Sequence, residues 1–184
     1  MELSIGQKVA YPNQGVCLVE DIEKKQIGES NMKFYSLRVL SDNSTIFVPM
    51  ANAEAVGIRP IIGSKQYKNL MVLLGEDFET VSDDWKVRSR EFNEKLQSGD
   101  IFEAADVLKK LTYLSSEKKL SFREQTLLEK AKFLIVSELR SAEMGTENKI
   151  EKKIDELIEC ACSNHHVDGD EGDAAVGAMA ATSH

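Results

Sequence analysis

The sequence is poor in the residues that mark secreted and membrane proteins. Only three of its 184 residues are cysteines, too few and too unevenly spaced for a disulfide framework. No apolar run approaches the roughly 20 residues that a membrane-spanning helix requires. The first residues, MELSIGQKVAY, have neither the basic nor the apolar region of a secretory signal. We therefore expect a cytoplasmic protein that has no membrane partner.

The sequence also lacks the common motifs of enzymes. The three histidines lie near the C-terminus, at positions 165, 166 and 184, and no phosphate-binding glycine loop or zinc-protease motif occurs. Cys160, Cys162, His165 and His166 offer four possible zinc ligands, but a C-x-C pair at a helix end points its two sulfurs apart. We therefore expect no catalysis, no cofactor and no metal.

Basic residues are few for a protein that would bind nucleic acid. The net charge is −8, and half of it comes from the last 21 residues, which contain four Asp or Glu and no Lys or Arg. Binding depends on a local patch rather than on the total, however. Between residues 109 and 123 a single glutamate accompanies five basic residues, a local charge of +4: Lys109, Lys110, Lys118, Lys119 and Arg123.

The first 60 residues are rich in the β-branched and aromatic residues that are typical of strands. Turn signals separate four short runs: QKVAY, VCLVEDI, KFYSLRVL and STIFVP. Pro49 ends the last run, because proline has no N–H for a sheet ladder. Four or five short strands in about 60 residues predict a small β-barrel, which limits the number of exposed edges.

After residue 60 the apolar residues follow helical spacing. Capping residues and apolar stripes predict five helices. The first spans 65–74, the second begins after Asp83 or Asp84 and ends at Gly99, and the third begins after Asp100. The fourth begins at the Ser121–Glu124 capping box, and the fifth spans about 147–162. From Asn164 onward no period is visible, which predicts a disordered acidic tail. The fold class is therefore α+β with two domains, 1–63 and 64–163, and a tail, 164–184.

The only tryptophan, Trp85, stands at the head of a helix in which Lys86, Arg88 and Arg90 follow at alternate positions. Trp85 shares a helical face with two apolar residues farther along, which favours a place in the core. An exposed place beside the basic residues would instead allow contact with nucleic acid. The residue pattern leaves both roles open.

Motifs in both halves resemble one family, the CarD/CdnL bacterial transcription regulators, over about residues 1–160. The N-terminal half contains V-x-Y-P-x-x-G at Val9–Gly15, followed by Val48-Pro49 and Asn52-Ala53-Glu54. The helical half contains these further matches: Trp85, Leu96-x-Ser98-Gly99-Asp100, Leu120-Ser121-x-x-Glu124, Ala131 and Glu138-Leu139. Single motifs are weak, but their order and spacing together are specific.

The resemblance implies an N-terminal Tudor-like barrel that binds the RNA polymerase β subunit, here through Lys25, Leu37, Phe47 and Pro49. It also implies a helical domain that contacts promoter DNA at the upstream edge of the transcription bubble. In the family a tryptophan wedges into the minor groove and stabilises the open complex, and Trp85 matches its position. The DNA-contacting residues expected from this match are Trp85, Lys86, Arg88, Arg90, Lys109, Lys119 and Arg123.

The sequence departs from the family pattern at two positions. Phe47 stands where some members have arginine, which predicts a more apolar polymerase contact. Gln125 stands where a basic residue often follows the glutamate of the L-S-x-x-E motif, which weakens one expected phosphate contact. We expect a monomer that bridges polymerase and promoter DNA. The alternative is a polymerase-binding adaptor without significant DNA contact.

Overall fold

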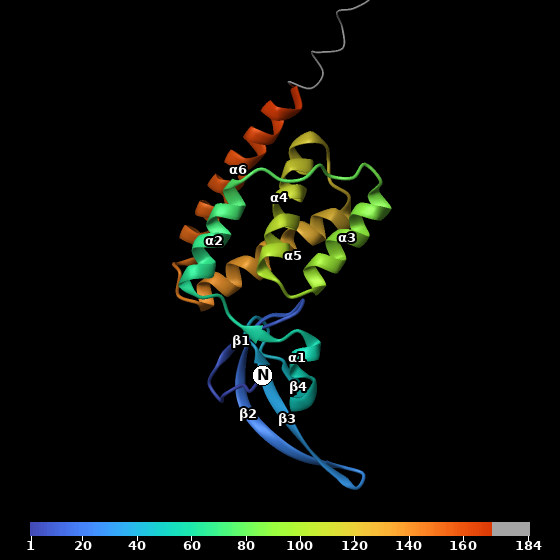
Figure 1. The fold of residues 1–184 in the computed structure, drawn as a ribbon, viewed down its shortest axis with the longest axis vertical. Coiled ribbons are helices and arrows are strands. Elements are labelled where there is room, and N and C mark those ends of the chain that lie inside the picture. The colour runs from blue at the N-terminus through green and yellow to red at the C-terminus, as the bar shows by residue number, and fades with distance from the viewer. Residues whose placement is uncertain (171–184) are drawn as a thin grey trace, which may run out of the picture.

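The computed structural model describes residues 1–170, with an antiparallel sheet at one end and a helical bundle at the other (Figure 1). The first 60 residues form the sheet, and the bundle follows from residue 64. The order of the elements follows the change from strand-like to helical patterning in the sequence. The α+β class expected from the sequence is therefore confirmed.

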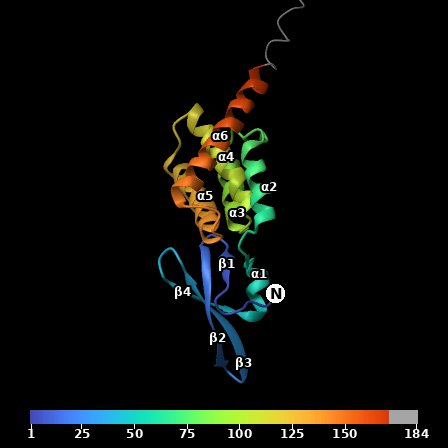
Figure 2. The same cartoon turned by 90° about the vertical axis from the view of Figure 1, so that its left-hand side faces the viewer.

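Five strands pair within the described residues in the order β4-β3-β2-β1-β5, all antiparallel: β1 (Lys8–Tyr11), β2 (Gly15–Ile27), β3 (Ser30–Val39), β4 (Thr45–Pro49) and β5 (Arg59–Pro60). A 3-10 turn, η1 (Met50–Asn52), and a short helix, α1 (Ala53–Val56), connect β4 to β5. The four runs predicted as strands correspond to β1 to β4. The paired ends of β2 and β3 form a long hairpin that projects away from the bundle (Figures 1 and 2).

One face of the sheet packs into a core of its own. Leu37 lies opposite Val19 and Ile46, and Tyr35 lies opposite Val48, so these side chains share one face. Tyr35 is fully buried, and its hydroxyl accepts a hydrogen bond of 3.0 Å from the N–H of Leu3. The chain start is thereby held across the sheet.

Five longer helices form the bundle: α2 (Ser64–Gly75), α3 (Trp85–Gln97), α4 (Ile101–Glu117), α5 (Phe122–Ser141) and α6 (Glu147–Asp170). Asp84 and Asp100 cap α3 and α4, and Ser121 and Glu124 form the capping box of α5, as predicted. None of the helices within residues 1–170 has both the length and the apolar character that crossing a membrane demands.

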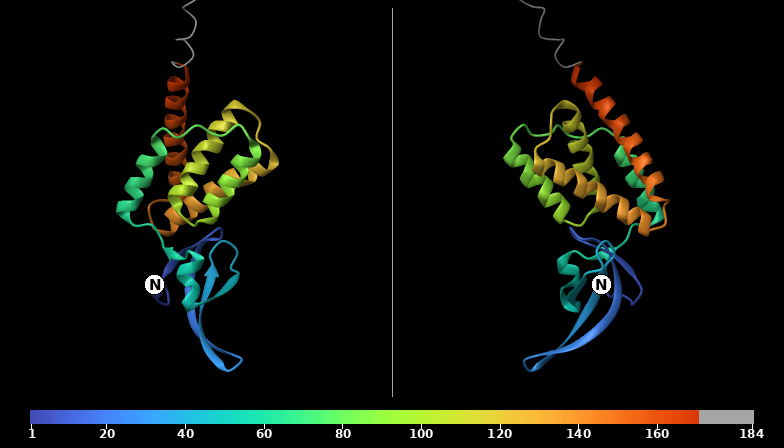
Figure 3. Two further views of the ribbon diagram at one scale, coloured as in Figure 1. Left: turned by 45° about the vertical axis from the view of Figure 1, so that its right-hand side comes forward. Right: turned by 180° about the vertical axis from the view of Figure 1, so that it is seen from behind.

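The last helix is longer than the sequence pattern predicts. It continues to Asp170, so the expectation of disorder from Asn164 onward is wrong for residues 164–170. The rest of the predicted tail lies outside the described residues. Figure 3 shows α6 running beside α2 and extending beyond the other helices. The helices share one apolar core, whose largest fully buried members are Leu70, Leu74, Phe92, Leu111, Ile135, Leu139, Ile154 and Ile158.

The sheet and the bundle are joined by a hydrogen bond and by close packing of apolar atoms. Lys8 donates a 3.0 Å hydrogen bond to the carbonyl of Ser141 at the end of α5. Pro12 packs against Gly99, whose φ is +79°. A Cβ at Gly99 would lie only 2.9 Å from Pro12 Cγ, so glycine is required both by the backbone conformation and by the close approach. The C-terminal end of α3 therefore touches the sheet, while its N-terminal end points away from it (Figure 1).

Candidate functional site

Trp85 is the first residue of α3 and lies at the end of that helix that is remote from the sheet. The carboxylate of Asp84 caps the helix by accepting a 2.9 Å hydrogen bond from the N–H of Lys86. The Trp85 side chain is 57% exposed, whereas Phe92 on the same predicted face is buried. Lys86 Nζ lies 5.8 Å from the centroid of the indole ring. Of the two roles that the sequence left open, the structure places Trp85 in the exposed one.

Arg88 follows Trp85 by one turn but is only 3% exposed. Its Nη2 and Nε atoms donate to Oε1 of Glu124 at 2.6 and 3.1 Å, and Nη1 donates to the carbonyl of Ser82 at 2.6 Å. Burial raises the pKa of Glu124, but hydrogen bonds from Ser121 and Arg88 outweigh this effect and bring the pKa down to about 2. The expectation that Arg88 contacts DNA is therefore corrected: its charge ties the start of α3 to the start of α5.

A hollow of about 360 Å³ lies beside Trp85, between the first turns of α3 and α5; its lining residues are Trp85, Ser89, Ser121, Arg123 and Glu124. Phe122, the first residue of α5, lies between two of these lining residues and is 89% exposed. No motif in the sequence singled out Phe122. The available signal was the helical phase, because at about 100° per residue Phe122 points away from the stripe that contains Leu127, Ala131 and Ile135.

The other predicted DNA contacts divide into exposed and buried groups. Lys109 is only 2% exposed, and its ammonium donates to the backbone carbonyls of Leu73 and Glu76. The expectation that Lys109 contacts DNA is therefore corrected, and the predicted basic run from 109 to 123 is not a continuous surface. Four predicted residues are exposed and form no ion pair with another described residue: Lys86, Arg90, Lys119 and Arg123.

A second candidate surface lies on the sheet, on the face opposite its core. Phe47 on the edge strand β4 is 46% exposed, and Lys25 Nζ lies 3.7 Å from the centroid of its ring. Pro49 is two residues from Phe47 and lies opposite Phe34, so these three side chains share the outer face. The structure therefore brings together Lys25, Phe47 and Pro49 of the predicted polymerase-binding residues.

Leu37, the fourth residue predicted to bind the polymerase, does not belong to this outer face. It is 0% exposed and packs in the core of the sheet. A partner could not reach it without opening that core, so the prediction of a direct contact is corrected. The sequence pattern could not separate the two faces, because β3 combines apolar residues on both of them.

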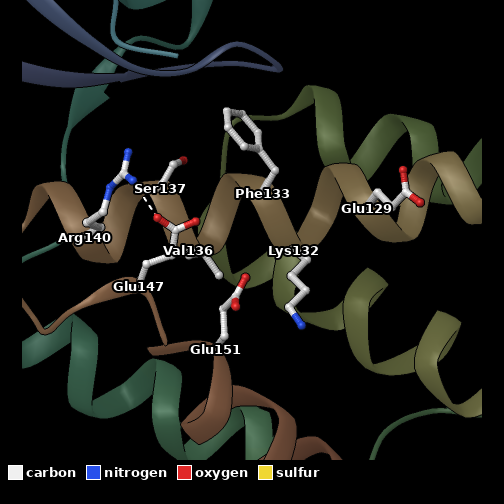
Figure 4. Close-up of a pocket in the computed structure, with 8 residues that line it drawn as sticks. All are labelled: Glu129, Lys132, Phe133, Val136, Ser137, Arg140, Glu147 and Glu151. Atoms are coloured by element: carbon white, nitrogen blue, oxygen red, sulfur yellow. Dashed lines mark hydrogen bonds and ion pairs between the residues drawn. The ribbon is translucent and has the colours of Figure 1, made fainter. Parts of the chain in front are cut away.

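A further hollow, of about 270 Å³, lies between α5 and the start of α6 (Figure 4). Arg140 and Glu147 form an ion pair of 2.7 Å across it, and Phe133 points from α5 toward the strands. Its remaining charged residues carry both signs, and its lining includes neither histidine nor cysteine.

His165 has a defined place in the structure. One ring nitrogen lies 2.7 Å from the Asp77 carboxylate, and the ring stacks on Phe78 with a centroid distance of 4.3 Å. The expectation of disorder from Asn164 onward is therefore wrong for this residue. Its contacts anchor the end of α6 to the segment between α2 and α3. Within the described residues no cluster of three or more His, Cys, Asp or Glu side chains suits a metal ion.

Comparison with known proteins bears on both halves of the chain. The models of the CarD-like/TRCF RID domain and of the CarD C-terminal domain match residues 3–62 and 69–155. YdeB of Bacillus subtilis (strain 168), which is named as a transcription factor, is 30% identical over 148 residues, or 79% of this chain and 95% of YdeB. The solution structure of the 72-residue N-terminal domain of Myxococcus xanthus CarD is 36% identical and covers 32% of this chain and 79% of that domain, with a TM-score of 0.28. The chain belongs to the CarD family of transcription regulators that interact with RNA polymerase.

Proposed function

We propose that this protein binds the polymerase β subunit through the outer face of its sheet and promoter DNA through the start of α3, and thereby stabilises the open complex. It would act without catalysis, in the cytoplasm, at the nucleoid where polymerase is bound. The observation that carries the proposal is Trp85: a large aromatic side chain, 57% exposed, at the first position of a helix.

The support beneath Trp85 favours a wedge. The Arg88–Glu124 ion pair holds the starts of two helices together directly behind it. Unstacking a base step costs a few kcal/mol. A side chain that enters the step must therefore keep its position against this opposing free energy. A rigidly mounted aromatic loses little conformational freedom on binding, so more of the contact free energy remains for this task.

The charge distribution supports a proposed DNA contact that depends on the polymerase. Lys86, Arg90, Lys119 and Arg123 are exposed around the site, but the whole chain has a net charge of −8. A few phosphate contacts on an acidic protein give weak and salt-sensitive binding. Attachment to the β subunit would raise the effective concentration of Trp85 at the promoter without requiring a larger basic surface.

The polymerase contact is assigned to the outer face around Phe47. Because β4 is an edge strand, its outer backbone groups can pair with a strand of a partner. Phe47 and Pro49 offer apolar anchors on this strand, and Lys25 adds a positive charge beside the Phe47 ring. This combination of apolar core and charged rim is common in protein interfaces.

The test is the half-life of the open complex formed by the cognate polymerase, with and without the protein. Trp85→Ala should shorten the half-life toward that of polymerase alone while polymerase binding remains unchanged. Val72→Ala is a matched control, because Val72 is also an exposed apolar residue on a helix and is 59% exposed. If Trp85→Ala and the unaltered protein gave the same half-life, the DNA part of the proposal would fail.

One observation favours the alternative, an adaptor that binds polymerase without significant DNA contact. Two of the six predicted basic DNA contacts, Arg88 and Lys109, are buried, which leaves a smaller positive surface than the sequence indicated. The same experiment separates the two functions. For an adaptor, Trp85→Ala would leave the open-complex half-life unchanged, and the effect of the protein would not change with salt beyond that of polymerase itself.

A further inference from the structure

Trp85 and Phe122 occupy equivalent positions on two helices. Each is the first residue of its helix, directly after the capping residue, and each is largely exposed. The starts of these helices are joined, because Arg88 of α3 donates to Glu124 of α5 at 2.6 Å. The two aromatic side chains are therefore carried by one rigid unit, with the 360 Å³ hollow between the first turns of the helices.

Local structure does not account for a phenylalanine at position 122. The capping box is formed by Ser121 and Glu124, so the residue between them has no part in it. A hydrophobic staple would use the residue before the cap, Leu120, and the fourth helical residue, Gln125. Phe122 also has a lower helix propensity than many polar residues, and at 89% exposure it gains almost nothing from burial. An aromatic residue here is best explained by an external partner.

We propose that Phe122 is a second stacking residue for DNA, and that this end of the bundle holds an unpaired strand. The inference rests on the proposed function and extends it. The hollow would receive one unstacked base against Trp85, and Phe122 would stack on a neighbouring base. Each base of a single strand exposes its π-faces, whereas the faces in a duplex are covered by their neighbours.

The surroundings of the hollow fit this occupant. Its volume is at the lower end of the range for small-molecule sites, about 300–1,000 Å³. Arg123 lies in the lining, and the side chains of Lys86, Arg90 and Lys119 are exposed on the same or adjoining segments. Apolar surfaces for bases beside unpaired cations for phosphates are the usual composition of a single-strand binding groove.

The experiment uses the full chain bound to the cognate polymerase. Promoters carry one abasic site at a time in either strand of the upstream bubble edge, and open-complex half-life is measured for each. With the unaltered protein, at least one abasic position should shorten the half-life, by about tenfold if one base stack is lost. Phe122→Ala should shorten the half-life similarly on the intact promoter, and should then be insensitive to that same abasic position.

Trp85→Ala and Val72→Ala run in parallel, with thermal unfolding of each variant. The inference is overturned if Trp85→Ala shortens the half-life while Phe122→Ala behaves like Val72→Ala. It is also overturned if Phe122→Ala lowers binding to polymerase alone, since Phe122 would then contact protein. A third contrary result is that Phe122→Ala weakens binding of the protein–polymerase complex to a fully paired upstream DNA fragment as much as it weakens the open complex. If neither aromatic variant has an effect, the proposed function fails, and this inference fails with it.

Discussion

Arg59 and Glu138 connect the sheet to the bundle through a bidentate ion pair. Nη1 and Nη2 of Arg59 lie 2.7 and 2.9 Å from the two carboxylate oxygens of Glu138, which also accepts a 2.9 Å hydrogen bond from the N–H of Ile62. The Nε of Arg59 donates to the carbonyl of Gly99, in the loop between α3 and α4. A single side chain from β5 thus contacts α5 and the loop that follows α3. In the proposed function this clamp sets the distance between the polymerase contact and Trp85.

Arg59→Ala should therefore loosen the relative orientation of the two halves. Glu138 would remain buried with one donor in place of three, which should destabilise the protein by about 1–3 kcal/mol. Small-angle X-ray scattering should show a wider distribution of dimensions, and denaturant unfolding should show the loss of stability. Arg140→Ala is a matched control, since its ion pair with Glu147 is exposed and lies within the bundle. Identical scattering of Arg59→Ala and the control would contradict the clamp.

Phe47→Glu should weaken binding to the isolated β subunit by at least about tenfold, because a charge would replace the main apolar anchor of the proposed contact. The side chain is 46% exposed, so the fold should tolerate the change. Val56→Glu introduces the same charge at an exposed position on α1 and should bind normally. A quantitative two-component binding assay checks both variants. Equal affinities for the two variants would place the polymerase contact elsewhere.

Local signals in the sequence were sufficient for most of the fold. The caps at Asp84, Asp100 and Ser121 and the apolar stripes are properties of short segments, so they predicted the five helices of the bundle, although not the short helix α1. The end of α6 was different. Its last described turns are held by contacts between His165 and Phe78, which are 87 positions apart in the chain, and composition alone cannot reveal such a contact.

The site was only partly predictable for the same reason. A run of basic residues shows which side chains are charged, but their exposure depends on partners that are distant in the sequence. Arg88 is paired with Glu124, which is 36 residues away, and Lys109 donates to a carbonyl of Leu73, also 36 residues away. The edge strand β4 contains three consecutive apolar residues, Ile46 to Val48, so the outward position of Phe47 and the buried position of Leu37 both depend on the register.

Truncation of two aromatic residues on α3 should change the stability of the protein by very different amounts. Phe92 is fully buried, and Phe92→Ala should destabilise the protein by about 3–5 kcal/mol. Trp85 is exposed, and Trp85→Ala should change the free energy of unfolding by no more than about 1 kcal/mol. Denaturant unfolding of both variants measures the difference. A large loss of stability in Trp85→Ala would mean that the indole is part of the core in solution.

The Arg88–Glu124 ion pair should make the stability of the protein depend on pH in the acidic range. The pKa of Glu124 falls from its ordinary value of 4.5 to about 2 in the folded protein, so the folded state favours the charged carboxylate. The stabilisation from this group is then complete above pH 4.5 and disappears as the pH falls toward 2. Glu124→Gln keeps the shape of the side chain but cannot carry the charge. The unaltered protein should therefore be more stable than Glu124→Gln at pH 7, and the difference should shrink between pH 4.5 and 2.

Arg88→Ala tests the other partner of the same pair. Removing the guanidinium leaves the Glu124 carboxylate buried without its opposite charge, which should destabilise the protein by about 3–5 kcal/mol at pH 7. Because protonation of Glu124 removes the unpaired charge, Arg88→Ala should lose less stability on acidification than the unaltered protein does. Denaturant unfolding between pH 7 and 2 follows both effects. Parallel pH profiles for the unaltered protein, Glu124→Gln and Arg88→Ala would contradict a functional ion pair behind Trp85 and Phe122, and the joined helix starts would need another support.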